Sequence, residues 1–154
     1  MSEAIRLVQR DELHKLLNLY KYLHEDDPDV TVNNELEGLW TGICADPSIY
    51  YIVADVDGKL VSTCTMAIIK NLTRNLRPYG LIENVVTHPD YREKGLGTKV
   101  LKEAVEIANK NNCYKVMLMT SSTKEKTLKF YEKVGFERGK KTGFLISLKA
   151  MTFP

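Results

Sequence analysis

The stretch Leu81-Ile-Glu-Asn-Val-Val-Thr-His-Pro-Asp-Tyr-Arg-Glu-Lys-Gly-Leu-Gly-Thr-Lys99 predicts a strand, a tight loop and the start of a helix. Its apolar, β-branched first half favours a pleated strand. Pro89 lacks the N–H that a ladder needs, so we expect the strand to end near His88. Gly95 and Gly97 let the backbone turn. The free N–H groups at the following helix N-terminus, with the helix dipole, form an anion site suited to phosphate.

Two familiar phosphate loops do not fit this stretch. A Walker A loop needs Lys directly after its last glycine, whereas Thr98 follows Gly97 here. A dinucleotide fingerprint needs three glycines at the first βα turn, whereas this chain has two, past its middle. A glycine-punctuated turn without a ligand is the plain alternative.

A second block lies downstream at Leu128-Lys-Phe-Tyr-Glu-Lys-Val-Gly-Phe136. Together with Arg92-x-x-Gly95-x-Gly97 it resembles the acyl-CoA pyrophosphate loop and the Phe-Tyr-Glu-Lys-x-Gly-Phe block of the GNAT superfamily of N-acetyltransferases. The resemblance in element order runs from Ile5 to Leu148. It implies an acyltransferase that moves the acetyl group of acetyl-CoA, its co-substrate, to a primary amine of a small molecule by direct attack in a ternary complex.

The periodicity predicts the element order β-α-α-β-β-β-α-β-α-β in one domain, residues 1–154. The expected strands are 4–8, 49–56, 60–69, 79–87, 115–120 and 144–148, with one more short strand near Phe136. The expected helices follow Asp11, cover 35–45, begin at Leu96 and end at Gly135. The fold class is α/β, a mixed sheet of six to seven strands flanked by about four helices, and the GNAT resemblance adds a splay between the central parallel strands.

Composition limits the classes of partner and ligand that we expect for this chain. The chain has 154 residues, 44% hydrophobic and 27% charged, with a net charge of +2, so bulk charge does not imply nucleic acid. No apolar run approaches the ~20 residues that span a bilayer, and no signal peptide is visible, so we expect no membrane partner and a cytoplasmic protein. The three cysteines lack metal-type spacing and are expected to be small buried hydrophobes, and no metal site is predicted. A homodimer is a frequent habit of the resembled family.

The cofactor residues fall into two groups. Backbone N–H groups of the loop are expected to bind the pyrophosphate: Arg92, Glu93, Lys94, Gly95, Leu96, Gly97 and Thr98. By the resemblance, backbone groups of Val85, Val86 and Thr87 pair with pantetheine as if it were another strand. Lys124 stands where the family often has an Asn that contacts pantetheine, and Ser121 and Ser122 can substitute for it.

Glu83 is the candidate base. It lies among apolar residues, so we expect partial burial, which makes a carboxylate more basic. Alternation places Glu83, Val85 and Thr87 on one face. The alternative is a structural carboxylate that pairs with Arg74 or Arg77.

Tyr131 matches the family tyrosine that protonates the departing thiolate, and core packing of its ring is the alternative. Arg74 and Arg77 are candidate substrate-binding residues for an acceptor phosphate or carboxylate. The strand Glu83-Asn-Val-Val86 resembles that of glucosamine-phosphate N-acetyltransferases, which makes a small phosphorylated amine a reasonable acceptor. Acetylation of a protein N-terminus or lysine, and a non-catalytic acyl-CoA sensor, are the competing functions.

Overall fold

The computed structural model describes residues 1–151. The chain clusters into two compact units, Met1–Thr120 and a second that begins at Ser121. Each unit is described by itself.

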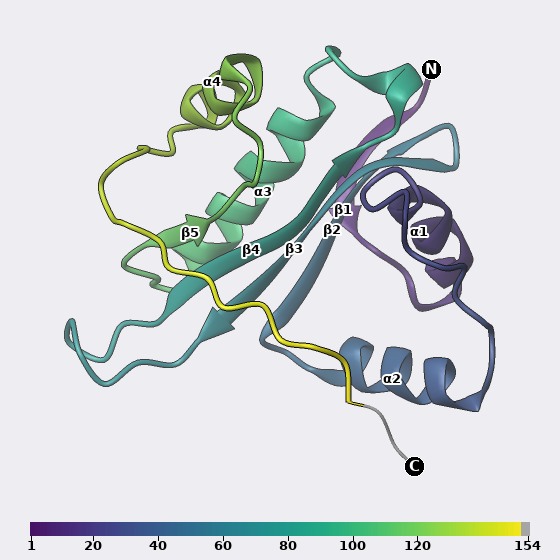
Figure 1. Cartoon of the computed structure of the whole chain (residues 1–154), viewed down its shortest axis with the longest axis horizontal. Helices are drawn as coiled ribbons and strands as arrows, with labels where there is room; N and C mark the ends of the chain where they lie inside the picture. Colours follow the sequence, from purple (N-terminus) through teal and green to yellow (C-terminus); the bar gives the residue numbers. More distant parts are fainter. Residues whose placement is uncertain (152–154) are drawn as a thin grey trace. The chain divides into compact units, whose positions relative to one another are not determined.

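The first unit is built on a five-stranded sheet in the order β1-β2-β3-β4-β5 (Figure 1). Neighbouring strands are antiparallel except β4 and β5, which run parallel. The strands are β1 (Glu3–Leu7), β2 (Ile49–Val56), β3 (Lys59–Ile69), β4 (Tyr79–Thr87) and β5 (Val116–Leu118). The helices of this unit are α1 (Leu13–Tyr20), α2 (Asn34–Ala45) and α3 (Leu96–Lys110), with short 3-10 turns at Arg10–Glu12 and Pro89–Tyr91.

Helices cover both faces of this sheet (Figure 1). On one face Leu16 of α1 and Trp40 of α2 pack with Val53 and Leu60 of the sheet. On the other, α3 contacts β2, β3 and β4. The buried side of α3 carries Leu96, Val100, Leu101, Ala104 and Ala108, the spacing of a helix with one apolar stripe. The sheet core is therefore sandwiched, and β4 leads directly into α3.

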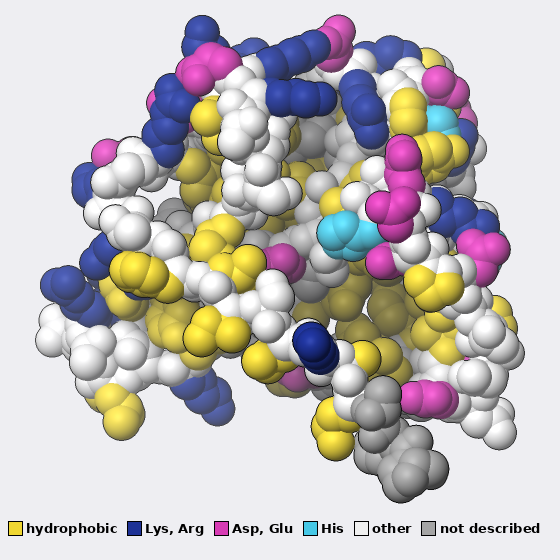
Figure 2. All heavy atoms as spheres, viewed as in Figure 1, with side chains coloured by type: hydrophobic (Ala, Val, Ile, Leu, Met, Phe, Trp, Pro, Cys, Tyr) yellow, Lys and Arg dark blue, Asp and Glu magenta, His cyan; other side chains and the backbone are white. Residues whose placement is uncertain are grey.

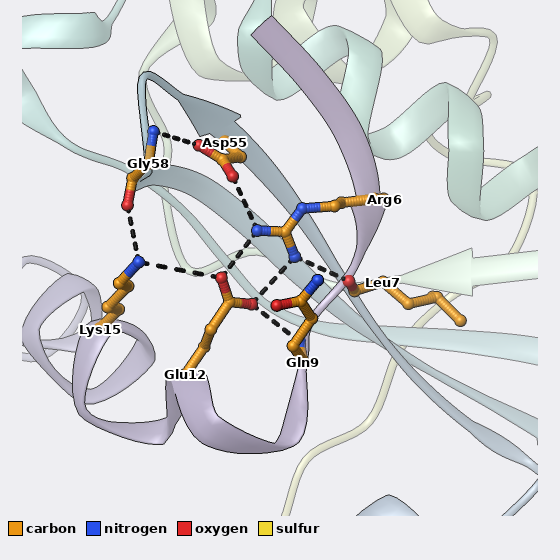
Figure 3. A network of polar contacts seen from close by, with 7 residues as sticks. All are labelled: Arg6, Leu7, Gln9, Glu12, Lys15, Asp55 and Gly58. Carbon is orange, nitrogen blue, oxygen red and sulfur yellow. Dashed lines mark hydrogen bonds and ion pairs between the residues drawn. The ribbon is translucent and has the colours of Figure 1, made fainter. Parts of the chain in front are cut away.

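A buried carboxylate fastens the start of α1 to the sheet (Figure 3). The Arg6 guanidinium donates to both oxygens of Glu12, at 2.9 and 2.7 Å, and to Asp55 at 2.7 Å. The Gln9 N–H donates to the same Glu12 carboxylate at 2.8 Å. These donors, with the Arg6 hydrogen bond first, hold the pKa of Glu12 below its ordinary value.

The second unit contains α4 (Glu125–Val134), which ends at Gly135 with a φ of 122°. Residues 144–148 are not a strand, and no strand lies near Phe136, so the prediction of six to seven strands is wrong for residues 1–151. The physical reason is that a strand needs a ladder partner, and 144–148 have none among the described residues. Phe144, Leu145, Ile146 and Leu148 are 78–91% exposed.

The predictions for the sheet, the helices and the cysteines have different outcomes. The mixed α/β sheet and four helices are confirmed. Cys64 and Cys113 are buried as expected, but Cys44, in the last turn of α2, is exposed. Among residues 1–151, no cluster of three or more His, Cys, Asp or Glu side chains can hold a metal ion. None of the helices in that range combines the length and apolar character of a membrane-spanning segment. Figure 2 shows both signs of charge spread over one face of the molecule.

Candidate active site

The N-terminus of α3 presents free backbone donors. Gly95 is its N-cap residue with a φ of 79°, and a Cβ built there meets nothing within 4 Å. The cap residue makes no side-chain hydrogen bond to this end, and the first hydrogen bond back to the cap comes from Lys99. The N–H groups of Leu96, Gly97 and Thr98 are therefore those that an α-helix leaves unsatisfied at its start. Open space and convergent donors fit a pyrophosphate.

The loop before α3 is held by its own contacts. The Arg92 Nε donates to the Thr87 carbonyl oxygen at 3.1 Å, and the Arg92 N–H donates to Pro89 O at 3.3 Å. The Arg92 backbone donor is thus already used, so its part is to fix the loop on the end of β4. Lys94 Nζ lies 5.1 Å from the centroid of the Tyr91 ring. This ammonium brings positive charge to the loop.

The β4 strand extends beyond the end of its parallel neighbour, β5. It pairs with β5 only through Gly80, Leu81 and Ile82, whose partners are Val116, Met117 and Leu118. Beyond Ile82 that edge of β4 has no strand partner among the described residues, although the opposite edge stays paired with β3 as far as Thr87. Val85, Val86 and Thr87, the expected pantetheine partners, all lie in the open part.

A β-bulge at Asn84 changes the faces of β4. Thr65 pairs with Glu83 and Thr63 with Val86, so one residue of β3, Cys64, opposes two of β4, Asn84 and Val85. Asn84 has a φ of 55°, a left-handed conformation that Asn tolerates better than most residues. Glu83 therefore shares a face with Val86. The predicted alternation of Glu83, Val85 and Thr87 on one face is wrong because the extra residue interrupts it.

Glu83 is exposed, so the prediction of partial burial is also wrong. β5 stops pairing at the preceding residue and leaves Glu83 uncovered. The alternative of a structural ion pair is not observed: within residues 1–151 neither Arg74 nor Arg77 bonds to Glu83. The carboxylate is available to a ligand on the face where α1 contacts β3 and β4.

The two candidate substrate arginines lie in different surroundings. The Arg77 side chain donates to the carbonyl oxygens of Asn112, at 3.1 Å, and Cys113, at 2.9 Å, just after α3. Arg74 has a φ of 54° and its guanidinium lies 5.8 Å from the centroid of the Tyr114 ring. The Arg77 guanidinium is thus used in structural hydrogen bonds, and the Arg74 guanidinium is the more accessible of the two.

In the second unit, Tyr131 lies on α4 between two other rings. Its centroid is 4.9 Å from that of Phe130 and 6.4 Å from that of Phe136. These contacts orient the phenol ring. Ser122 Oγ accepts the Lys124 N–H at 3.3 Å just before the helix. The Lys124 backbone donor is therefore used inside the turn.

The Asn84 bulge is the site feature that the sequence analysis missed. A polar Asn inside a run of β-branched residues was the available signal, because Asn is depleted in regular strands and enriched at positive φ. Thr65 was missed as well, since only the register places it beside Glu83.

Comparison with known proteins places the chain in a family. A glucosamine 6-phosphate N-acetyltransferase of Trypanosoma brucei brucei is 32% identical over 140 residues, 86% of this chain and 87% of that protein. A solved structure from Agrobacterium tumefaciens, described as an acetyltransferase, is 41% identical with a TM-score of 0.88, over 94% of this chain and 99% of that one. A solved glucosamine-6-phosphate N-acetyltransferase of Arabidopsis thaliana is 25% identical with a TM-score of 0.82, over 97% and 99%. The model of the acetyltransferase (GNAT) family matches residues 10–136, and the chain belongs to that family.

Proposed function

We propose that this protein transfers the acetyl group of acetyl-CoA to a primary amine of a small molecule in a ternary complex. The observation that carries the proposal is the continuity of an open β4 edge with the free N-terminus of α3. Leu96, Gly97 and Thr98 would hold the pyrophosphate, and Val85 to Thr87 would hold the pantetheine arm. The bound thioester supplies an activated acetyl group.

Glu83 is proposed to take the proton of the incoming ammonium, directly or through water. An alkyl ammonium has a pKa near ~10, so it needs a base to become a nucleophile at neutral pH. The exposed carboxylate lies on the α1 side of β4, where an acceptor can approach it. Tyr131 is proposed to donate a proton to the departing sulfur, by its match to the family tyrosine.

The acceptor belongs to this proposal as well. Relatives named glucosamine 6-phosphate N-acetyltransferases favour a small phosphorylated amine. Arg74 is the better placed of the two arginines to meet its phosphate, because the Arg77 guanidinium already binds two carbonyl oxygens.

A homodimer is a further proposal. The support is the row of exposed apolar side chains at 144–148, which a second copy can cover. Light scattering of the purified protein measures its mass, and a monomer across the micromolar range would contradict the dimer.

Two measurements test the transferase. Saturating acetyl-CoA should raise the melting temperature, because a ligand that binds only the folded state stabilises it. Free thiol should then appear with at least one member of a panel of phosphorylated and plain amines. Cofactor binding without thiol release from any amine would favour a non-catalytic acyl-CoA sensor, and release only with peptides would favour a protein N-terminus or lysine.

A further inference from the structure

Three hydroxyl groups meet on the α1 face of the sheet. Tyr20 Oη lies 3.5 Å from Thr65 Oγ1. The Tyr51 side chain also interacts with that of Thr65, and Tyr51 and Thr65 are directly paired across β2 and β3. All three side chains are partly buried. They form what we call the hydroxyl cluster: Tyr20, Tyr51 and Thr65.

Both phenols keep their protons at neutral pH. Burial raises the pKa of Tyr20 to about 12 and raises that of Tyr51 as well. The cluster is therefore uncharged and acts through hydrogen bonds alone.

A proton count shows that the cluster has a donor to spare. Three hydroxyls carry three protons, and the two contacts with Thr65 use at most two of them. No other group within residues 1–151 is hydrogen-bonded to these three oxygens. Each of the three residues is partly exposed to solvent, which leaves room for a partner at the remaining donor. It is available to a ligand oxygen or to water.

This spare donor lies next to the candidate base. Thr65 is directly opposite Glu83 across β3 and β4, and Tyr51 is directly opposite Thr65. Side chains opposite one another on adjacent strands have Cβ atoms about 4.5–5.5 Å apart. Tyr51, Thr65 and Glu83 therefore form a row across three strands. An amine bound at Glu83 would bring an oxygen on its neighbouring carbon within reach of Thr65.

We propose that the hydroxyl cluster is a specificity subsite in which Thr65 donates a hydrogen bond to an oxygen on the carbon next to the reacting amine. The inference rests on the proposed transferase function and adds a determinant of acceptor choice. Tyr20 and Tyr51 are positioning residues, because they hold the Thr65 hydroxyl in orientation. The acceptors favoured by this subsite are vicinal amino alcohols over plain alkyl amines.

The test uses two amines that differ by one oxygen, trans-2-aminocyclohexanol and cyclohexylamine. For the unaltered protein we expect kcat/KM to favour the amino alcohol about ten-fold, the effect of one good hydrogen bond. Thr65→Val should reduce that preference to about two-fold or less, chiefly through KM, and Thr65→Ser should restore it. Tyr20→Phe should reduce it partially.

Thr63→Val is the matched control. Thr63 lies on the same strand and face as Thr65, but its hydroxyl donates to Ile52 O at 2.7 Å inside the sheet. This variant should lose stability and keep the preference. A preference that survives Thr65→Val, or that falls equally in Thr63→Val, would overturn the subsite.

NMR titration with CoA present gives the dissociation constants of the two amines. These constants test the subsite independently of the proposed transferase function. An affinity ratio that collapses in Thr65→Val supports the subsite, and an equal ratio in both proteins overturns it. Absence of acetyl transfer to every amine, by contrast, counts against the proposed function itself.

Discussion

Thr65 on β3 lies directly opposite Glu83 on β4, on the face of the sheet that α1 contacts. The pairing puts a neutral hydroxyl beside an exposed carboxylate at the point where β4 loses its second neighbour. An acceptor that reaches Glu83 therefore meets β3 on one side and the open edge of β4 on the other.

Replacing Glu83 by Gln keeps the shape of the side chain and removes its basicity. We expect kcat/KM for the amine to fall about 100-fold at neutral pH, the usual contribution of a general base. The acid limb of the pH profile should flatten, while the melting-temperature shift caused by acetyl-CoA persists. Glu106→Gln, on the exposed side of α3, is the control. An unchanged acid limb in Glu83→Gln would eliminate this residue as the base.

Tyr131→Phe removes one hydroxyl and keeps the ring packed between Phe130 and Phe136. Turnover should fall about 10- to 100-fold because the departing thiolate loses its proton donor. The dissociation constant of acetyl-CoA should change by less than about two-fold, since the ring contacts remain. Tyr114→Phe is the control. Equal turnover in the two variants would leave Tyr131 a packing residue only.

Gly95→Ala tests the anion site against a matched glycine. Gly95 and Gly58 both have left-handed backbones, with φ of 79° and 83°, and open space around a Cβ. Alanine at either position should lower stability by about 1 kcal/mol. Only Gly95→Ala should also shrink the stabilisation by acetyl-CoA, which is about 2.7 kcal/mol at a hundred-fold excess over Kd. Thermal melting with and without acetyl-CoA measures this stabilisation. If acetyl-CoA raised the melting temperature equally in both variants, the cofactor would bind elsewhere.

Acid should weaken the anchor between Arg6 and Glu12. The pKa of Glu12 is lowered in the folded protein from an ordinary value of 4.5, first by the Arg6 hydrogen bond. A lowered carboxylate pKa stabilises the fold above the unfolded value, and this stability is lost as pH falls through the folded value. Glu12→Gln should cost about 2 kcal/mol at pH 7 and less below pH ~4.

The control for Glu12 is Glu125→Gln. The pKa of Glu125 is also lowered, chiefly by its Arg138 partner, but both side chains are exposed. Urea unfolding at several pH values measures both variants. If Glu12→Gln were no more destabilising than Glu125→Gln, the anchor would contribute nothing measurable.

Arg77→Ala and Arg74→Ala should divide into a structural and a binding effect. Arg77 binds two carbonyl oxygens just after α3, so its loss should cost about 1–2 kcal/mol of stability. Arg74→Ala should leave stability within about 0.5 kcal/mol and raise KM for a phosphorylated amine. A larger KM effect from Arg77 than from Arg74 would reverse this assignment.

Local chemistry explains why much of the fold was predictable. Val56-Asp57-Gly58 marks a hairpin, and the structure turns there with Asp57 and Gly58 at positive φ. The bounds of β2 and β4 agree with the prediction because apolar alternation and Pro89 define them. The glycine loop and α3 follow from Gly95 and the apolar stripe of the helix.

The missed features depend on partners rather than on local sequence. Residues 144–148 have strand-forming side chains, but whether they become a strand depends on a ladder partner. The exposure of Glu83 depends on where β5 ends, which its own apolar neighbours do not encode. The hydroxyl cluster joins α1, β2 and β3, so only the tertiary structure assembles it.

Because of the extra residue at Asn84, the face on which Glu83 lies does not follow from the alternation of the later residues of β4. If β4 kept all its residues but lost the bulge, regular alternation back from Thr87 would turn Glu83 toward the α3 side, while Thr87 and the loop after it kept their pairing with β3. Side-chain roles therefore do not transfer into this protein by counting back from His88. Sequence alignments with relatives must place any gap at this position before residues of the two strands are equated.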